Sequence, residues 1–453
     1  MFEAKYSAPE VDLFGERATP ATHDDWTAPV ALGPVVASLT LPGSKSITNR
    51  ELVLSALSDA PSRLRAPLHS RDSDNMVAAL RALGTSIEAA PATGDYGDDW
   101  IVTPAEELTG STTIECGLAG TVMRFVPAVA ALALGPTVFD ADDAARGRPM
   151  GGLMAGLAAL GVDVDATRAD SLPFTVHGTG RVAGGRLEID ASQSSQFVSG
   201  LLLSAPRFDE GIELHHSGDR LPSVPHIEMT LDALRRRGVD ATSDGAASWR
   251  VAPGPIAGRD VLIEADLSNA APFLAAAVAT GGRVTIAGWP ESTTQVGADL
   301  ADILPLFGAE VAVADGRITV TGPAEISGVD LDLTTGGELA PALAALAALA
   351  TGPSTLRGIG HIRHHETDRL AALATEITRL GGEVEEFDDG LRITPRPLTG
   401  GRWLSYHDHR MATAGAIIGL VVEGVRIENI ATTAKTLPQF PTLWRAMVGA
   451  HSA

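Results

Sequence analysis

The sequence predicts an α/β protein built from six copies of a unit that contains two helices and several short strands. Three observations carry this prediction. A helix end of the Leu-Gly type recurs at a nearly constant interval, a second series of helices alternates with the first, and short strands lie between them. A chain of 453 residues with 45% hydrophobic residues is also long enough for two or more domains.

The first series of helices is recognised by where each helix stops. Amphipathic stretches end in a glycine at positions 84, 161, 238, 308 and 381, which lie 77, 77, 70 and 73 residues apart. Glycine is a common helix terminator because it adopts the left-handed backbone without strain. Alternating apolar and polar residues follow each glycine and predict a strand. A sixth helix is expected over 441–449.

The second series is expected to be buried. Its helices open near residues 44, 119, 193, 268, 337 and 408, at intervals of 75, 74, 75, 69 and 71. Stretches such as 271–279 and 339–350 are rich in alanine and leucine on all sides, which is typical of helices inside a core. Strands are expected over 35–41, 112–115, 187–189, 261–264 and 284–286. Two interleaved series with one interval indicate that the chain arose by duplication.

Composition excludes several classes of function. The net charge of -22 and the pI near 4.9 argue against nucleic acid or an anionic membrane as a partner. The single cysteine, Cys116, excludes an internal disulfide framework and fits a reducing, cytoplasmic location. The longest apolar run, 339–350, is too short to span a membrane. Residues 1–30 lack the order of a signal peptide and are expected to form an acidic, flexible extension.

Lysine is rare in this chain. Only three of the 34 Lys and Arg residues are lysines, namely Lys5, Lys45 and Lys435. An ammonium group has a pKa that its surroundings can shift, whereas a guanidinium stays charged. A lysine kept among arginines therefore favours a site that moves protons or needs a compact charge. Chance alone can also leave three lysines in an arginine-rich chain. The residues around each lysine decide between these two explanations.

Polar and basic motifs open the predicted helices. Residues 44–46, 120–124, 194–196 and 408–410 begin helices of the buried series, and 148–149, 223–225, 366–369 and 435–436 begin helices of the other. Helix N-termini favour anions because their N–H groups are unpaired. Helix capping is enough to explain each serine or aspartate alone. It does not explain the basic residues, which predict binding of phosphate and carboxylate groups: Lys45, Arg50, Arg124, Arg148, Arg369, Arg410 and Lys435.

Three other site types fail on spacing. Residues 43–46 are similar to the end of a P-loop, but the upstream glycine is absent. Residues 178–180 lead into a strand instead of the helix that a dinucleotide fingerprint requires. The histidines at 361, 364 and 365 lack the spacing of metal ligands, so no metal is expected.

Taken together, the motifs resemble the enolpyruvyl transferases, and within them the branch that acts on shikimate 3-phosphate. The matching segments, in the family's order, are 42–50, 118–124, 148–150, 194–197, 365–370, 408–411 and 435–436. The resemblance implies a two-domain inside-out α/β barrel with three units in each domain. Domain one would cover 44–264, and domain two 31–43 plus 265–453. Ligands would bind in the cleft between them, which closes around them.

The reaction implied by the resemblance joins phosphoenolpyruvate to the 5-hydroxyl of shikimate 3-phosphate and releases phosphate, without a cofactor or metal. It belongs to the shikimate pathway, which leads to chorismate and the aromatic amino acids. The two small-molecule substrates are the expected partners, and a monomer is expected.

The resemblance also assigns residues to each ligand. Shikimate 3-phosphate would contact Lys45, Ser46, Arg50, Ser194, Ser195, Gln196, Ser223, Glu338, His361 and His365. Phosphoenolpyruvate would contact Lys45, Gly120, Arg124, Arg148, Gln196, Arg369, Arg410 and Lys435. Lys45, Glu338, Glu366 and His409 would serve the catalytic chemistry, in which the enol carbon is protonated and the 5-hydroxyl attacks the resulting cation.

Several positions depart from the family pattern. Leu118 replaces an asparagine, Phe125 a proline, His226 a tyrosine, His361 an asparagine, His365 a lysine and Glu338 an aspartate. These changes leave the reaction class intact, but bear on rate, pH profile and inhibitor sensitivity.

Two other functions remain open. One is the sister transferase that acts on UDP-N-acetylglucosamine, whose usual mobile-loop cysteine finds no match because Cys116 lies at a strand end. The other is a non-catalytic anion-binding homologue. The retained carboxylates Glu338 and Glu366 count against this second reading, because binding an anion does not require them.

Overall fold

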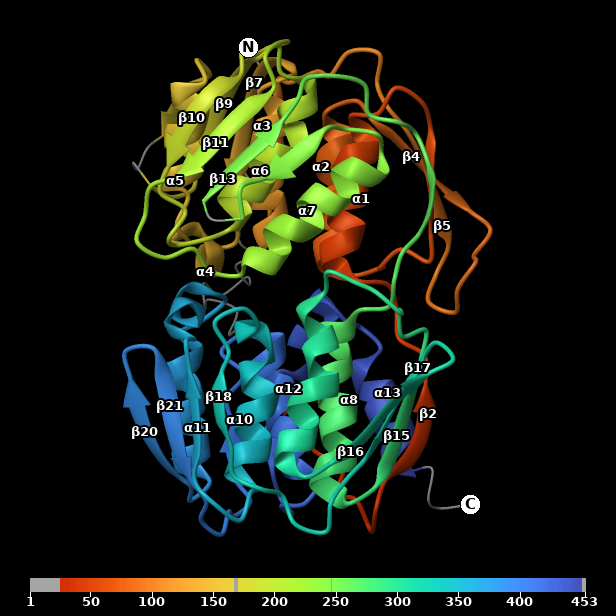
Figure 1. Ribbon diagram of the computed structural model, residues 1–453, viewed down its shortest axis with the longest axis vertical. Helices are drawn as coiled ribbons and strands as arrows, with labels where there is room; N and C mark the ends of the chain where they lie inside the picture. The colour runs from red at the N-terminus through yellow and green to blue at the C-terminus, as the bar shows by residue number, and fades with distance from the viewer. Residues whose placement is uncertain (1–24, 167–169, 246, 450–453) are drawn as a thin grey trace, which may run out of the picture.

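The computed structural model describes residues 25–166, 170–245 and 247–449. Its two halves, an upper and a lower one in Figure 1, each surround a hydrophobic core. The core of the upper half draws on residues between 52 and 256. The core of the lower half draws on residues from 26 to 41 and from 267 to 447. The lower half is therefore assembled from both ends of the chain.

The described part of the upper half contains three four-stranded sheets, with the orders β14-β3-β5-β4, β6-β7-β9-β8 and β10-β11-β13-β12. In each, the first two strands are parallel and the remaining pairs antiparallel. The strands are β3 (Ser62–Arg65), β4 (Ser86–Ala90), β5 (Asp99–Thr103), β6 (Thr112–Glu115), β7 (Leu134–Asp140), β8 (Asp163–Ala166), β9 (Phe174–Thr179), β10 (Gly185–Ile189), β11 (Ile212–His216), β12 (Ala241–Ser243), β13 (Ser248–Val251) and β14 (Asp260–Leu262).

The described part of the lower half contains two four-stranded sheets, β16-β17-β15-β2 and β18-β19-β21-β20, and a three-stranded one, β1-β23-β22. The four-stranded sheets repeat the pairing of the upper half. The strands are β1 (Trp26–Thr27), β2 (Val36–Leu39), β15 (Arg283–Ala287), β16 (Glu310–Ala314), β17 (Arg317–Thr321), β18 (Asp330–Asp332), β19 (Ser354–Arg357), β20 (Glu383–Phe387), β21 (Gly390–Thr394), β22 (Arg402–Trp403) and β23 (Arg426–Ile427).

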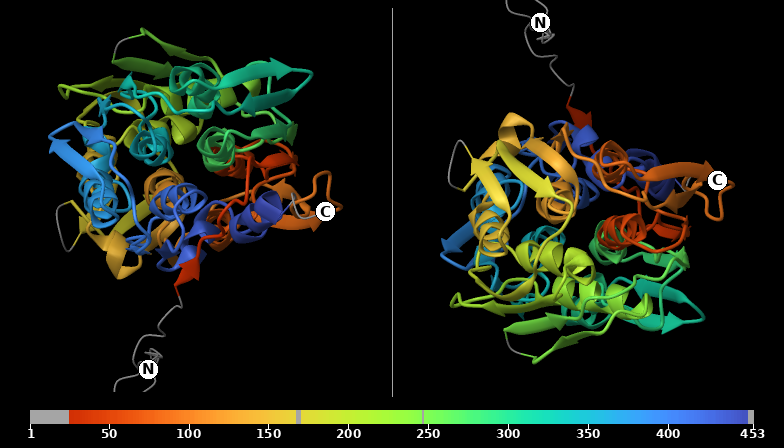
Figure 2. Two further views of the ribbon diagram at one scale, coloured as in Figure 1. Left: turned by 90° about the horizontal axis from the view of Figure 1, so that it is seen from below. Right: turned by 90° about the horizontal axis from the view of Figure 1, so that it is seen from above.

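Helices gather toward the centre when the molecule is viewed along its long axis, and the strands lie toward the outside (Figure 2). The expected buried series is α1 (Lys45–Ala56), α3 (Gly120–Ala130), α6 (Gln196–Ser204), α8 (Leu267–Thr280), α10 (Ala340–Ala348) and α12 (His409–Gly419). The glycine-stopped series contains α2 (Arg71–Ala82), α5 (Gly151–Ala159), α7 (Val224–Arg236), α9 (Leu300–Ile303) and α11 (Arg369–Arg379), and α13 (Phe440–Gly449) follows at the end. A short helix, α4 (Asp143–Arg146), precedes α5.

The five predicted helix stops are confirmed. Their glycines have φ values of 103°, 84°, 81°, 95° and 102° in chain order, in the region that favours glycine. The stretch before Gly308 differs from an ordinary helix, because it is divided into η2 (Val296–Asp299), α9 and η3 (Leu304–Phe307). Pro305 lies in η3 and lacks the N–H that a continuing α-helix needs.

The chain passes between the halves at two adjacent crossing points. Gly43 and Ala265 form an antiparallel bridge, and the Ser44 N–H donates to the Glu264 carbonyl oxygen at 2.7 Å. A Cβ at Gly43 would collide with the carbonyl oxygen of Ala66, so that a residue without a side chain is needed there. Because α1 and α8 begin just beyond the two crossings, their N-termini lie near the boundary between the halves.

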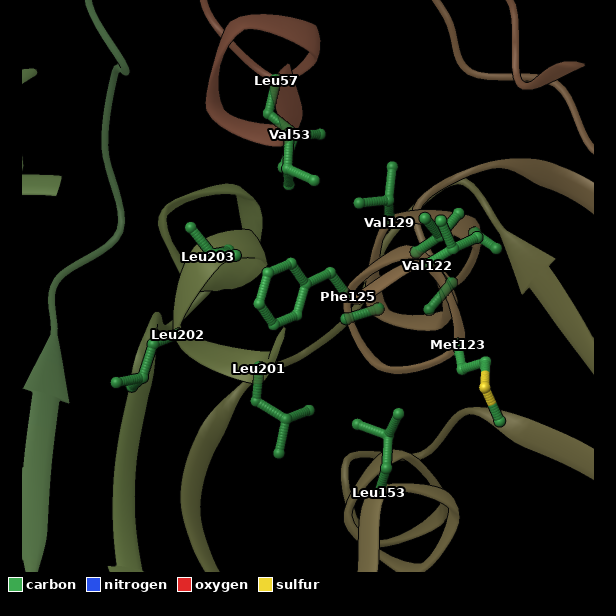
Figure 3. Packing of buried hydrophobic residues seen from close by; sticks show 14 of the residues in the cluster. Val53, Leu57, Val122, Met123, Phe125, Val129, Leu153, Leu201, Leu202 and Leu203 are labelled. Atoms are coloured by element: carbon green, nitrogen blue, oxygen red, sulfur yellow. The ribbon is translucent and has the colours of Figure 1, made fainter. Parts of the chain in front are cut away.

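Phe125 fills the core of the upper half at a position where the family pattern has proline. Its ring points between helices, toward Leu201 and Leu203 of α6 (Figure 3), and the residue is fully buried. The guanidinium carbon of Arg50 lies 5.3 Å from the centre of the ring. The aromatic ring therefore makes a cation–π contact with Arg50, one of the predicted ligand-binding arginines.

Three further expectations concern the N-terminal extension, the single cysteine and membrane-spanning helices. Of the expected extension over 1–30, residues 1–24 lie outside the described residues, whereas Trp26 and Thr27 form β1 and pair with β23. Cys116 is fully buried, and burial raises the pKa of its thiol. In the described part of the chain, none of the helices is both long and apolar enough to cross a membrane.

Candidate functional site

A polar cavity lies between the two halves and is lined by both. Every residue that the sequence assigned to a ligand or to catalysis lines it. From the upper half these are Lys45, Ser46, Arg50, Gly120, Arg124, Arg148, Ser194, Ser195, Gln196 and Ser223; from the lower half they are Glu338, His361, His365, Glu366, Arg369, His409, Arg410 and Lys435. Lys45 and Lys435, which are 390 positions apart in the sequence, thus face one cavity.

Most of these side chains lie at or near the first turn of a helix. Helix capping explains only some of the polar residues found there. Asp266, Asp368 and Asp408 accept a backbone N–H of their own helices. In the described chain, Ser44 and Ser195 stand at the cap position without making a side-chain cap bond. The capping interpretation requires these hydroxyl groups to accept a backbone N–H at the helix start, and they do not.

Left-handed backbone at residues other than glycine precedes three of the cavity segments. Ser223 has a φ of 52° directly before α7, and Asn429 has a φ of 48° before η6 (Ile430–Lys435). Tyr406 and His407, with φ values of 53° and 56°, stand just before α12. Such residues are uncommon and cluster at functional sites. They turn the chain sharply where α7, α12 and η6 approach the cavity.

Glu366 lies among cations. One oxygen accepts a hydrogen bond from Lys435 Nζ, and the other lies 2.8 Å from Arg369 Nη2. Burial would raise the pKa of Glu366, but Lys435 and Arg369 hold it well below its usual value. Burial lowers the pKa of Lys435, and Glu366 opposes that shift. The carboxylate is therefore ionised at neutral pH and faces an ammonium group that gives up its proton more readily than usual.

Arg369 has most of its donors engaged by the protein itself. Asp408 accepts from Nε at 2.7 Å and from Nη2 at 3.2 Å, and His365 Nδ1 accepts from Nη1 at 3.0 Å. With Glu366 added, the pKa of the guanidinium is raised despite burial. Because His365 accepts at Nδ1, its neutral tautomer carries the proton on Nε2.

Glu338 is the second carboxylate of the cavity. It accepts from Ser268 Oγ, its Oε2 lies 3.1 Å from His226 Nε2, and its Oε1 lies 3.7 Å from Arg410 Nη2. Burial would raise the pKa of Glu338, but His226, Arg410 and Ser268 lower it well below its usual value. Two ionised carboxylates therefore face the cavity, each beside cations.

The upper half supplies arginines with donors that point at few protein acceptors. Arg124 donates to Gln196 at 3.1 Å, and Arg148 to the Leu118 carbonyl oxygen at 2.9 Å. Within the described residues the buried Nε of each finds no acceptor. A Cβ at Gly120 would lie only 2.8 Å from Arg124 Nη1, so glycine leaves room for this arginine. Both arginines line the cavity, where a bound anion would add charge-assisted hydrogen bonds.

Arg50 behaves differently from the other predicted cations. Its Nε donates to Thr230 at 2.8 Å, and its Nη1 and Nη2 donate to the carbonyl oxygens of Ser46 and His226 at 2.9 and 2.8 Å. Burial lowers its pKa to about 9. Arg50 lines the cavity, but most of its donors organise the chain around it.

Three histidines of the cavity, His361, His365 and His409, are kept neutral. Burial and Arg369 lower the pKa of His361 to about 4 and that of His365 well below its usual value. Burial also lowers the pKa of His409 well below its usual value. Among the described residues no group of three or more His, Cys, Asp or Glu is arranged to hold a metal ion.

Sequence reasoning missed two acidic residues. Asp72 is buried, and its Oδ2 lies 3.7 Å from Lys45 Nζ. Asp266 accepts the Lys45 backbone N–H at 3.0 Å and lines the cavity. In the sequence Asp72 follows a helix-start serine and Asp266 precedes a helix, so both read as ordinary helix-start residues. Only the folded chain brings them to Lys45.

Comparison with known proteins agrees with this geometry. Residues 30–444 match the family model described as EPSP synthase (3-phosphoshikimate 1-carboxyvinyltransferase). A 3-phosphoshikimate 1-carboxyvinyltransferase from Kocuria rhizophila is 57% identical over 436 residues, which cover 95% of this chain and 98% of that protein.

Solved structures show the same fold at low identity. An EPSP synthase from Acinetobacter baumannii superposes with a TM-score of 0.77 at 21% identity, over 95% of this chain and 98% of that one. The enolpyruvyl transferase NikO from Streptomyces tendae gives a TM-score of 0.71 at 19% identity, over 92% and 96% of the two chains. The match along nearly the whole sequence and the polar cavity between the halves lead to one conclusion: the chain belongs to the EPSP synthase family of enolpyruvyl transferases.

Proposed function

We propose that this enzyme transfers the enolpyruvyl group of phosphoenolpyruvate to the 5-hydroxyl of shikimate 3-phosphate in the cavity between its halves and releases phosphate. The observation that carries the proposal is that two lysines, four arginines and two ionised carboxylates from both halves line one cavity: Lys45, Lys435, Arg124, Arg148, Arg369, Arg410, Glu338 and Glu366. Cations of this number suit two anionic ligands held side by side, because they neutralise the repulsion between them.

The binding roles follow the residue types. Shikimate 3-phosphate is proposed to bind along the helix starts that carry Ser46, Ser194–Gln196 and Ser223, near Lys45 and Arg50, with Glu338, His361 and His365 facing it from the lower half. Phosphoenolpyruvate is proposed to lie among Lys45, Gly120, Arg124, Arg148, Gln196, Arg369, Arg410 and Lys435. Support comes from the hydroxyls of Ser195 and Ser223, which make no side-chain cap bond, and from the arginines Arg124 and Arg148 that line the cavity.

The chemistry proceeds by addition and elimination. A proton is added to the methylene carbon of phosphoenolpyruvate, the neighbouring carbon becomes cationic, and the 5-hydroxyl oxygen attacks it and loses its proton. A proton is then removed from the new methyl group as phosphate leaves, which restores the double bond. Glu338 and Glu366, both ionised, stabilise the cation and accept protons, while Lys45 serves as acid or base and His409 supports the exchange.

A phosphate-release assay tests this assignment directly. Phosphate should be released only when phosphoenolpyruvate and shikimate 3-phosphate are both present. Lys45→Met should reduce turnover by several orders of magnitude, and Lys435→Met should raise the KM for phosphoenolpyruvate. The assignment of Lys45 fails if Lys45→Met turns over at a near-normal rate while its melting temperature is unchanged.

The two other candidate functions have distinct outcomes in the same assay. Phosphate release with UDP-N-acetylglucosamine in place of shikimate 3-phosphate would indicate the sister transferase. Binding of both ligands by calorimetry without any release of phosphate would indicate a non-catalytic homologue. The 57% identity to a 3-phosphoshikimate 1-carboxyvinyltransferase favours the first assignment over both.

We also propose that each half is an inside-out α/β barrel of three duplicated units, with 44–264 as one domain and 31–43 plus 265–453 as the other. The repeated sheet order and the two separate cores support this division. A monomeric, cytoplasmic enzyme that needs no cofactor remains the expectation for its state in the cell. Sedimentation of the purified protein would test the monomer.

A further inference from the structure

One side-chain contact joins the two halves directly across the cavity. His226 belongs to α7 of the upper half, and Glu338 belongs to η4 (Gly337–Leu339) of the lower half. Their Nε2 and Oε2 atoms lie 3.1 Å apart, and the two side chains are 16% and 17% exposed. The contact is therefore inside the cavity and partly shielded from water, where a hydrogen bond to a carboxylate is stronger than on an open surface.

The backbone of His226 is held firmly on its own side. Its carbonyl oxygen accepts hydrogen bonds from Arg50 Nη2 at 2.8 Å and from Thr230 Oγ1 at 3.1 Å. Pro225 precedes it in the first turn of α7, and Ser223 sets the helix start with its left-handed backbone. A proline in the first turn has a fixed φ angle that suits the helix. The imidazole thus projects from a rigid base.

Glu338 has one close hydrogen-bond donor in its own half. Ser268 donates to it, but Arg410 Nη2 is 3.7 Å away, beyond a normal hydrogen bond. Glutamate has one more methylene than the aspartate of the family pattern, and therefore one more rotatable bond to fix. The charged or titratable groups that act on Glu338, or feel its charge, are His226 from α7, Arg410 from α12, Asp266 before α8, Arg50 from α1, Arg369 from α11, and His361 and His365 from η5 (Gly360–His364) and the residue after it.

We propose that His226 is a positioning residue for Glu338, which it holds at the centre of the cavity by a hydrogen bond from Nε2 across the two halves. This inference rests on the proposed role of Glu338 at shikimate 3-phosphate. His226 Nε2 lies 3.1 Å from Oε2 and Ser268 donates to Oε1, so that the carboxylate has one polar neighbour from each half. The free lone pairs of the carboxylate are then aimed at the ligand, and the same bond makes the position of Glu338 depend on the approach of the halves.

The experiment is a double-mutant cycle between His226 and Glu338. His226→Phe should lower kcat/KM for shikimate 3-phosphate about tenfold, which corresponds to about 1.4 kcal/mol. In a Glu338→Gln background the same change should have less than about a twofold effect, because Glu338 is no longer a carboxylate to be oriented. His226→Gln, which keeps a donor, should restore part of the loss. His215→Gln is the matched control, because His215 lies on the exposed side of β11 and contacts Ser248.

The pH profile separates positioning from simple packing. Removal of the His226 donor takes away an interaction that favours the ionised carboxylate, so the acid limb of kcat/KM should move to higher pH in His226→Phe and not in His215→Gln. The dissociation constant of shikimate 3-phosphate, measured by calorimetry, provides the cycle if Glu338→Gln is too slow to assay.

The possible failures are distinguishable. An equal loss from His226→Phe in both backgrounds would overturn the positioning role and leave the role of Glu338 intact. Full activity of Glu338→Gln would overturn the proposed role of Glu338 and this inference with it. If His226→Phe does not fold, His226→Gln carries the test: equal losses from this change in both backgrounds would count against the inference.

Discussion

Both carboxylate oxygens of Asp408 accept hydrogen bonds from Arg369, one from Nε at 2.7 Å and one from Nη2 at 3.2 Å. The same carboxylate accepts the Arg410 backbone N–H at 2.8 Å and thereby caps α12. One residue therefore joins the start of α12 to the first residue of α11. Both arginines line the cavity, so a residue that does not line it holds the guanidinium of Arg369 and the backbone of Arg410.

Asp408→Asn should weaken binding of phosphoenolpyruvate. Arg369 would lose a buried counter-charge, and its guanidinium would turn toward Glu366. We expect kcat/KM for phosphoenolpyruvate to fall at least about tenfold and the free energy of unfolding to fall by about 3 kcal/mol. Steady-state kinetics and urea unfolding measure the two effects. Asp143→Asn is the control, because Asp143 is 93% exposed in its pair with Arg146. A variant with normal kinetics would show that Asp408 does not direct Arg369.

His361→Gln should make the protein less sensitive to acid. The pKa of His361 is lowered to about 4 in the folded chain, whereas an unfolded histidine titrates near 6.5. Between these values the unfolded chain binds more protons, so stability falls as the pH drops from about 6.5 to about 4. The variant should therefore lose less melting temperature between pH 7 and pH 5 than the parent. Equal losses in both proteins would contradict the assignment.

Glu51→Gln should destabilise the upper half without touching the cavity. Arg237 is fully buried and donates to Glu51 Oε2 from Nε and Nη2, at 3.0 and 2.6 Å. Removing the carboxylate leaves a buried guanidinium charge without its partner, which costs about 3–5 kcal/mol. Urea unfolding measures this loss. Asp209→Asn is the control, because its pair with Arg181 is exposed and should contribute less than about 1 kcal/mol.

Phe125→Ala should lower stability by about 3–5 kcal/mol, since it removes a fully buried ring from the packing shown in Figure 3. The ring also supports the Arg50 guanidinium, so the KM for shikimate 3-phosphate should rise in the same variant. Phe125→Leu fills more of the space and should recover most of the stability but less of the KM. Thermal melting and kinetics on both variants separate packing from support of the arginine.

Regular local patterns made much of the fold predictable. A glycine that ends a helix with positive φ shows itself in one sequence, and so does a helix start rich in serine, lysine and arginine. The cavity membership of the candidate residues follows from the family resemblance together with these starts. These helix-start and helix-stop patterns are local, so they can be recognised without knowing how the units pack together.

The relations between distant units could not be predicted. Arg50 reads in the sequence as a free cation, but the fold gives its donors to Thr230 and to carbonyl oxygens of α1 and α7. Lys45 shows no sign of Asp72 or Asp266 as neighbours. These contacts depend on how helices from different units approach each other, and a single sequence carries no periodic signal for that approach.

The pairing of β2 with β15 affects how the chain folds during synthesis on the ribosome. Val36 pairs with Arg283, so the first strand of this sheet leaves the ribosome long before its neighbour has been translated. The upper half closes sooner, when β14 emerges and Asp260 pairs with Arg63. The nascent chain must therefore keep β2 unpaired while the intervening half folds, which leaves this early strand open to aggregation and chaperone capture until β15 has been translated.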